Sequence, residues 1–328
     1  MKKVIIFFMT SLFLYGCTEE KTETITVAQW GQEKYLIYLP FYIAQEKGFF
    51  KDEGLEIAVK FSGNDDQVFA TVLVGDAQFG IGDPVFTAIS REKGAKGKVI
   101  ASLVDGVAIW GVTNKDIKPI EKLDDLEGLK IGTFPAPSTN YALMKKTIVN
   151  NSEILKTTEI VQAPIGAQLA LLESGGADIA MDLEPGTSIA ESKGYKVIYS
   201  SPKFYGRFAF TGLTASEEYI NGNKEIVQKF VNAIEKALRF CHTNEVETTE
   251  VAIKLFPNLD NVVVGNAVKR MLVDKTIPDH AVMSDEAWQK AMQVRVDIGD
   301  LKELKPTADA VDNTFAEFAI NPSLMEAQ

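Results

Sequence analysis

A repeated pattern of residues is the feature that most limits what this chain can fold into. The first copy spans Gly75–Gly94, the second spans Gly175–Gly194, and a similar apolar stretch follows each copy. Both copies have the pattern of a short strand, a turn with an acidic residue and a proline, a helix that ends at glycine, and another strand. In open α/β sheets, such strand-to-helix turns lie at the carboxyl edge, where ligands bind. The repeat therefore predicts an α/β fold with two lobes, each of which directs one acidic turn towards a shared cleft.

The N-terminal segment 1–16 has the pattern of a secretion signal. A basic start precedes an apolar stretch, residues 4–14, that is too short to span a bilayer. The following Leu-Tyr-Gly-Cys resembles the lipobox of bacterial lipoprotein signals, although its tyrosine is bulkier than the residue usual there. The resemblance implies cleavage before Cys17, a lipid on its sulfur, and a polar tether over 17–23. The alternative is an ordinary secretion signal with an incidental cysteine.

The charge balance argues against nucleic-acid binding. The chain of 328 residues has a formal net charge of −11, which becomes −13 (−11 − 2) without the two lysines of the N-terminal segment. Binding to nucleic acid requires a clustered basic surface instead. A metal site is not expected, because His242 and His280 have no ligand-like spacing. We expect Cys241 to be a buried and unreactive thiol.

Catalytic motifs do not stand out in the sequence. The GxSxG pattern is missing, and the glycines at 80 and 82 lack the third glycine of a dinucleotide-binding loop. Asp182 and Glu184 could form a general acid and base, but no nucleophile motif accompanies them. The sequence therefore predicts a protein that is not an enzyme and that uses no cofactor.

Two stretches resemble the solute-binding proteins of ABC importers for nitrate, sulfonates, taurine and thiamine-type pyrimidines. They read FYIAQEKGFFKDEGLEI and GDAQFGIGDPVFTAISREKG, and the resemblance extends from about residue 25 to residue 215 in the order of its elements. It implies a periplasmic-binding-protein type II-like fold, in which a ligand cleft lies between two lobes joined by a hinge. The implied partners are a small-molecule ligand and the membrane subunits of an ABC permease, with the protein a monomer anchored by lipid at the outer face of the cytoplasmic membrane.

The resemblance also predicts how the chain divides between the lobes. The first lobe is discontinuous and comprises 24–112 together with 210–328, which carries the C-terminal helices. The second lobe comprises 113–209. Binding would then occur by hinge closure over the ligand, with affinity arising from burial between the lobes.

Candidate ligand contacts are the residues that this fold would place in turns at the cleft. They are Trp30, Tyr35, Tyr38, Gly82, Asp83, Phe134, Ser138, Thr139, Asp182, Glu184 and Phe210. Asp182 is included because an offset of one hundred places it at Gly82. The alternative roles are structural: Ser138 or Thr139 as the N-cap of a helix, and Glu184 as a cap of the helix that begins at Pro185.

The balance of these candidates favours a neutral or weakly basic heteroaromatic ligand, such as a pyrimidine, over a sulfonate or nitrate-type anion. Aromatic walls stack on rings, whereas the acidic residues would repel an anion in a dry cleft. Two other functions are consistent with the resemblance. One is an enzyme of thiamine-pyrimidine synthesis on the same fold, which uses a histidine and a pyridoxal cofactor, and the other is a ligand-sensing partner of a membrane receptor.

Overall fold

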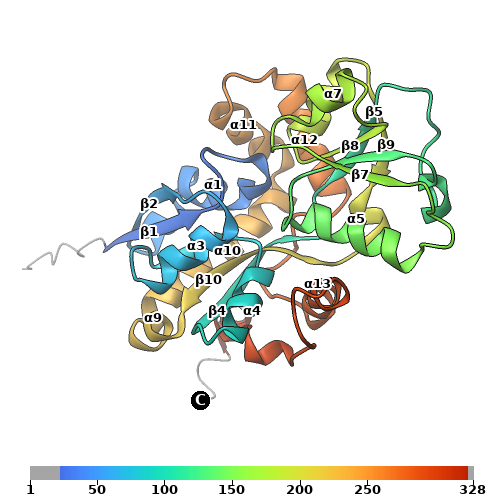
Figure 1. Ribbon diagram of the computed structural model, residues 1–328. Helices are drawn as coiled ribbons and strands as arrows, with labels where there is room; N and C mark the ends of the chain where they lie inside the picture. Colours follow the sequence, from blue (N-terminus) through green and yellow to red (C-terminus); the bar gives the residue numbers. More distant parts are fainter. Residues whose placement is uncertain (1–22, 324–328) are drawn as a thin grey trace, which may run out of the picture.

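The two copies of the repeated pattern lie in two separate five-stranded sheets, one in each lobe (Figure 1). The computed structural model describes residues 23–323, so the predicted signal, the lipidation site Cys17 and most of the tether lie outside the described residues. The first copy forms β3 (Phe79–Gly82), α4 (Val85–Glu92) and β4 (Gly97–Asp105). The second copy forms β8 (Ile179–Asp182), α7 (Gly186–Ser192) and β9 (Lys196–Ser200).

The first sheet has the strand order β2-β1-β3-β10-β4. Its remaining strands are β1 (Glu23–Gln29), β2 (Leu55–Phe61) and β10 (Ala209–Ser216). β1 is parallel to β2 and β3, whereas β10 is antiparallel to β3 and β4. The strand of the repeated pattern is therefore central, and the turn that follows it lies in the middle of the sheet edge.

The second sheet has the order β7-β6-β8-β5-β9, with β5 (Trp110–Thr113), β6 (Lys130–Thr133) and β7 (Glu159–Gln162). β6 is parallel to β7 and β8, and β5 is antiparallel to β8 and β9. Each strand of one sheet thus has a counterpart in the other, with β8 in the place of β3. Two-lobed α/β architecture, the predicted fold class, is confirmed.

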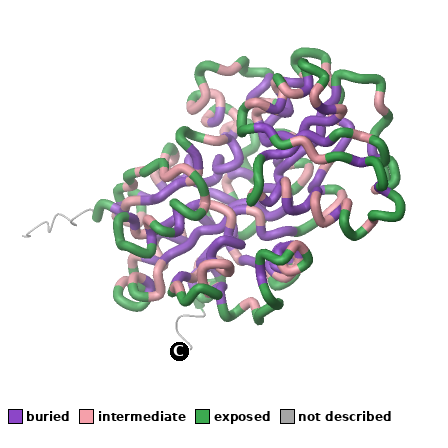
Figure 2. Tube along the Cα trace, in the orientation of Figure 1, coloured by how far each residue is buried: buried purple, intermediate pink, exposed green. Residues whose placement is uncertain are grey.

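The chain crosses between the sheets after β4 and again between β9 and β10, where α8 (Ser201–Tyr205) lies. The whole of β5 belongs to the second sheet, so a lobe boundary at residue 112 would cut through this strand. We therefore propose that the lobes divide within 106–109 and within 201–208. The first crossing, 106–109, is buried, whereas the second is buried at Ser201, Pro202 and Phe208 and exposed at Lys203, Gly206 and Arg207. In Figure 2, buried chain (purple) runs through the middle of the molecule, where the two lobes meet.

The first lobe has helices on both faces of its sheet. These are η1 (Leu36–Tyr38), α1 (Leu39–Glu46), α2 (Phe49–Asp52), α3 (Asp65–Leu73), α9 (Glu217–Gly222) and α10 (Lys224–Thr243). Phe79 of β3 stacks on Phe230 of α10 with 4.1 Å between ring centroids. On the other face α3 lies close to β3, because a Cβ at Gly80 would be only 2.9 Å from the Cγ1 of Val68. Cys241 is buried in α10, and burial raises the pKa of its thiol to about 12.

The second lobe has η2 (Leu123–Leu126), α5 (Thr139–Asn150) and α6 (Gln168–Glu173) in addition to α7. Leu172 of α6 and Ala190 of α7 form a small core with Ala180 of β8. Successive side chains of a strand point to opposite faces, so Met181 joins the main core on the other side of the sheet. α5 packs against this second sheet and presents its N-terminus at the strand ends.

The C-terminal helices hold the two lobes together. They are α11 (Glu245–Leu255), α12 (Asn261–Val273), α13 (Asp285–Asp297), η3 (Thr307–Asp309) and α14 (Thr314–Ile320). α12 packs against α7, and α13 packs against α5 as well as against α4 and β10. Figure 1 shows α12 at the upper side of the molecule and α13 at the lower side. α14 packs against α10 and β4 of the first lobe. Within residues 23–323, no helix combines the length and the apolar character that crossing a membrane requires.

Candidate ligand-binding site

A cavity of about 260 Å³ lies between the two lobes. Its wall includes seven of the predicted contacts, namely Trp30, Tyr38, Asp83, Phe134, Ser138, Thr139 and Phe210. The structure does not place the other four, Tyr35, Gly82, Asp182 and Glu184, in this wall. Residues that the sequence analysis did not single out complete it, and those that matter below are Asp65, Asp66, Phe86, Asn140 and Leu183.

Aromatic side chains form much of the cavity wall. Trp30 follows β1, and its ring lies 4.7 Å from the ring of Tyr35 and 6.4 Å from that of Tyr38, centroid to centroid. Tyr35 therefore supports Trp30 without lining the cavity itself. Phe134 follows β6 in the second lobe, so aromatic rings face the cavity from both lobes. Such a wall suits a flat ring that stacks between the lobes.

Two carboxyl groups of the first lobe meet at the cavity. The backbone N–H of Asp83 donates to Oδ1 of Asp65 at 2.7 Å, and Asp65 is the first residue of α3. A Cβ at Gly82 would lie 2.6 Å from the same Oδ1 atom. The contribution of Gly82 is therefore space for the Asp65 carboxyl. The sequence analysis did not single out Asp65, because nothing in the local pattern shows that α3 begins beside β3.

Asp83 connects the first lobe to the second. Its Oδ1 atom accepts from the N–H of Val85 at 3.1 Å, and its Oδ2 atom accepts from the hydroxyl of Thr139 at the start of α5. Arg295 of α13 reaches the same place, with Nη2 at 2.8 Å from the Thr139 hydroxyl and 3.5 Å from Asp83 Oδ2. The cavity is thus closed on one side by a hydrogen bond between the lobes.

Asp65 and Asp83 have different surroundings, which favour different protonation states. Desolvation in the cavity, and then the nearby Asp83 carboxylate, raise the pKa of Asp65 to about 8. Desolvation also raises the pKa of Asp83, but the Arg295 guanidinium and the hydrogen bond from Thr139 act against that rise. We therefore assign the proton to Asp65, which has no cationic partner in the described region, and the negative charge to Asp83. At neutral pH the cavity then offers a carboxylic acid beside a carboxylate.

Asn140 brings an unused hydrogen-bond donor to the cavity. The residue is 3% exposed, and its Nδ2 atom has no hydrogen-bond partner among the described residues. The preceding Ser138 is the N-cap of α5 and accepts from the N–H of Tyr141 at 3.3 Å, so the predicted capping role is confirmed. A buried unpaired amide is costly, and a polar atom of a ligand would satisfy it.

The acidic turn of the second copy does not face the cavity as predicted. The Oδ1 atom of Asp182 accepts from the N–H of Leu183 at 2.8 Å, and a Cβ at Gly186 would lie 2.2 Å from Oδ2. The carboxyl of Asp182 therefore lies against the start of α7, where burial raises its pKa to about 7. Only Leu183 of this turn lines the cavity.

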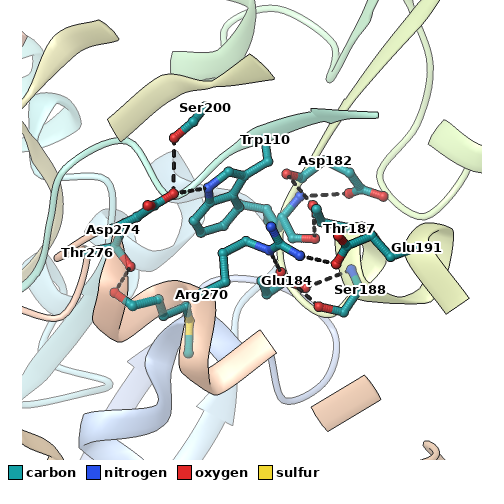
Figure 3. Close-up of polar contacts among 12 residues, drawn as sticks. Trp110, Asp182, Glu184, Thr187, Ser188, Glu191, Ser200, Arg270, Asp274 and Thr276 are labelled. Atoms are coloured by element: carbon teal, nitrogen blue, oxygen red, sulfur yellow. Dashed lines mark hydrogen bonds and ion pairs between the residues drawn. The ribbon is translucent and has the colours of Figure 1, made fainter. Parts of the chain in front are cut away.

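Glu184 has a structural role on the other side of the same turn (Figure 3). Its fully buried carboxylate accepts from the N–H and the hydroxyl of Ser188, both at 3.0 Å, which caps α7. Arg270 of α12 donates to it at 2.6 Å and also binds Glu191. On the same side, Asp274 after α12 accepts from the indole N–H of Trp110 at 2.7 Å. This cluster fastens α12 to the second lobe, so the capping interpretation of Glu184 is confirmed.

The ionisable side chains in the cavity wall are acidic. Asp65, Asp66 and Asp83 line it, whereas no lysine, arginine or histidine of residues 23–323 does so. His280 instead contacts Glu235 at 2.8 Å, away from the cavity. No group of three or more potential metal-binding side chains occurs in the part of the chain that the structure describes.

Comparison with known proteins supports a family assignment. Residues 37–248 match the model of the family described as NMT1/THI5 like. YtlA of Bacillus subtilis, which is named as a binding protein, is 26% identical over 95% of this chain and 94% of its own length. The formylaminopyrimidine-binding protein of Halalkalibacterium halodurans is 22% identical over 76% of this chain and 78% of its own. The THI13 protein of Saccharomyces cerevisiae, named 4-amino-5-hydroxymethyl-2-methylpyrimidine phosphate synthase, is 22% identical over 73% of each chain.

Solved structures share the fold at lower sequence identity. The alkanesulfonate-binding protein SsuA of Xanthomonas axonopodis pv. citri, bound to MOPS, has a TM-score of 0.66 at 14% identity, over 88% of this chain and 98% of its own. The periplasmic nitrate-binding protein NrtA of Synechocystis PCC 6803 also has a TM-score of 0.66, at 12% identity, over 92% of this chain and 89% of its own. These similarities confirm the fold of two-lobed periplasmic binding proteins.

Proposed function

Because the chain belongs to the NMT1/THI5-like family, we propose that it is an extracytoplasmic solute-binding protein that delivers a small polar organic ligand to an ABC importer. The observation that carries this proposal is the cavity between the lobes, with aromatic and polar groups from both. A ligand there would be buried by hinge closure, which is how two-lobed binding proteins gain affinity. The anchor at Cys17, the monomeric state and the permease partner are parts of the same proposal.

The ligand is proposed to be an amino-substituted heteroaromatic, of which pyrimidines are the simplest class. Trp30, Phe134 and Phe210 supply ring surfaces for stacking. The Asp83 carboxylate accepts from an exocyclic amino group, while the acid proton of Asp65 and the amide of Asn140 donate to ring nitrogens or oxygens. The formylaminopyrimidine-binding relative is named for a ligand of this kind.

An anionic ligand fits the cavity less well. A sulfonate or nitrate would face Asp83 and Asp66 with no basic side chain of the described residues in the wall. A like-charge contact in a desolvated site is much more unfavourable than in water. The start of α5 offers backbone N–H groups to an anion, but its side chains already hold Asp83 in place.

Enzymatic synthesis of a pyrimidine is a second candidate function, because relatives such as THI13 are named as synthases. The cavity does not fit a pyridoxal phosphate cofactor, since its wall has no lysine for a Schiff base and no basic residue of 23–323 to face the phosphate. Neither His242 nor His280, both within the described region, lines it. We therefore favour binding without turnover.

A thermal-shift screen of the purified protein tests the proposal. The panel contains 4-amino-5-hydroxymethyl-2-methylpyrimidine, formylaminopyrimidine, nitrate and an alkanesulfonate. A ligand at about 100 times its Kd stabilises the native state by about 2.7 kcal/mol, which gives a clear rise in Tm. We expect a rise with a pyrimidine and none with the anions. Tight binding of a sulfonate alone would contradict the proposed ligand class, and a transformed product detected by mass spectrometry would contradict binding without turnover.

A further inference from the structure

Arg295 lies directly behind the cavity wall without being part of it. It belongs to α13, its side chain is 1% exposed, and its guanidinium lies 5.5 Å from the centre of the Phe86 ring. A buried arginine requires partners for its charge and its N–H groups. Arg295 finds them in both lobes.

In the second lobe, Nη1 of Arg295 donates to the backbone oxygen of Pro137 at 2.8 Å, and Nη2 donates to the Thr139 hydroxyl at 2.8 Å. Towards the first lobe, Nη2 lies 3.5 Å from Oδ2 of Asp83. A further bond at 2.9 Å joins Nη1 to Asp300, which follows α13. Pro137, Thr139 and Asp83 all line the cavity, so one buried cation touches the outer side of both halves of its wall.

We propose that Arg295 is a positioning residue for the ligand, which fixes the Asp83 carboxylate and the Thr139 hydroxyl across the closed lobes. This inference rests on the proposed function, because it assigns to Arg295 the alignment of that cavity. Thr139 donates its proton to Asp83 while its oxygen accepts from Arg295, so the three groups form a chain with one defined orientation. Loss of Arg295 would release the Pro137 segment and free Asp83 to rotate or take up a proton.

The molecule contains a matched control in Arg270. It also projects from a C-terminal helix, is largely buried, and pairs with the acid that precedes the proline of a repeated turn. Its acid, Glu184, does not line the cavity. Arg295→Met and Arg270→Met therefore remove the same kind of ion pair, once at the cavity and once away from it.

The first experiment measures the Kd of 4-amino-5-hydroxymethyl-2-methylpyrimidine by calorimetry between pH 5 and pH 9. We expect Arg295→Met to weaken binding about tenfold or more, as misplacement of contact groups does. As the pH is lowered, this variant should lose affinity at a higher pH than the wild type does, because Asp83 has lost its cation. Arg270→Met should bind within about twofold of the wild type at each pH, as expected for a distant site. Arg295→Lys keeps the charge but not the forked geometry, so we expect an intermediate affinity.

A second measurement needs no ligand and separates this proposal from the ligand class. Carboxyl ¹³C NMR of Asp-labelled protein should show a higher pKa for Asp83 in Arg295→Met than in Arg270→Met or the wild type. If the wild type does not bind the pyrimidine, the ligand class is wrong and this titration alone decides the role of Arg295.

Equal affinities and equal pH profiles for Arg295→Met and the wild type would overturn the proposal. So would an equal loss in Arg270→Met, which would indicate a general loosening of the C-terminal helices. Should Arg295→Met fail to fold, Arg295→Lys and Arg270→Lys provide the same comparison with the charge retained.

Discussion

The two acidic turns of the repeat have the same place in the two lobes and different uses. Asp83 and Glu184 each precede the proline that opens the helix, and each is paired with an arginine from a C-terminal helix. Asp83 lines the cavity between the lobes, whereas Glu184 is fully enclosed against α12. The comparison shows that one supersecondary unit can line a cavity in one lobe and fasten a helix in the other.

The difference arises from the length of the turn. One residue, Asp83, stands between β3 and Pro84, whereas Leu183 and Glu184 stand between β8 and Pro185. The extra residue directs an apolar side chain to the cavity and turns the acid towards Arg270. Substitutions in both turns, in the aromatic wall and at Asp65 test this comparison.

Removing the buried ion pair between Arg270 and Glu184 should have the largest effect on stability. Arg270→Met leaves the Glu184 carboxylate buried without its cation, which typically lowers the free energy of unfolding by about 3–5 kcal/mol. Urea denaturation followed by circular dichroism measures the loss. The double variant Arg270→Met/Glu184→Gln should recover part of it, and a single variant as stable as the wild type would show that the pair contributes nothing.

Replacing Asp83 and Asp182, two of the three acids predicted as ligand contacts, should separate the turns by ligand affinity. Asp83→Asn removes the carboxylate in the cavity and should weaken pyrimidine binding by about 2 kcal/mol or more, the range for a hydrogen bond to a charged group. Asp182→Asn should change the Kd by less than about twofold, because its carboxyl faces α7 rather than the cavity. Calorimetric titration of both variants with one pyrimidine gives the answer, and a larger effect at Asp182 would reverse the assignment of the two turns.

The aromatic wall should contribute a smaller amount. Trp30→Ala removes one stacking surface, worth about 0.5–1.5 kcal/mol, so the Kd should rise by up to about tenfold. Trp110→Phe is the matched control, because Trp110 packs beside α12 and does not line the cavity. Quenching of tryptophan fluorescence by the ligand should disappear in the first variant and persist in the second.

The proton on Asp65 predicts a modest dependence of stability on pH. Its pKa is raised to about 8 in the folded protein from an ordinary value of 3.8, so the native state holds a proton that the unfolded state has lost between these limits. Stability should therefore fall as the pH rises from about 4 to about 8, and Asp65→Asn should remove that part of the decline. At pH 8 we expect the variant to gain about 1 kcal/mol or more over the wild type. Denaturant midpoints from pH 5 to pH 9 measure this, with Asp66→Asn as the neighbouring control; parallel profiles for Asp65→Asn and the wild type would exclude the buried proton.

Much of the fold could be predicted from the repeat. The glycine and proline positions mark the ends of strand and helix, and two copies require two sheets, as observed. The candidate site was harder, because counting one hundred residues aligned Asp182 with Gly82, whereas counting back from the proline aligns Glu184 with Asp83. An alignment of the two copies at a fixed offset of one hundred residues does not reveal that one turn is a residue longer than the other.

Other parts of the site depend on contacts that no local pattern contains. Arg295 lies 212 positions from Asp83 in the chain, and Arg270 lies 86 from Glu184. Helical periodicity shows which face of α12 or α13 is apolar, but not which acid its arginine meets. Asp65 was missed as a contact for the same reason, since its approach to β3 depends on Gly82 having no side chain.

The position of α13 near the end of the chain has a consequence for synthesis. Every strand of both sheets precedes residue 217, so the two lobes can pair their strands while the segment that carries Arg270 and Arg295 is still being made. Until that segment arrives, Glu184 and Asp83 lack their cations. The proposed binding site is thus completed only after the strands of both sheets, and a chain cut short before α13 would have both sheets but no Arg295 behind the cavity wall.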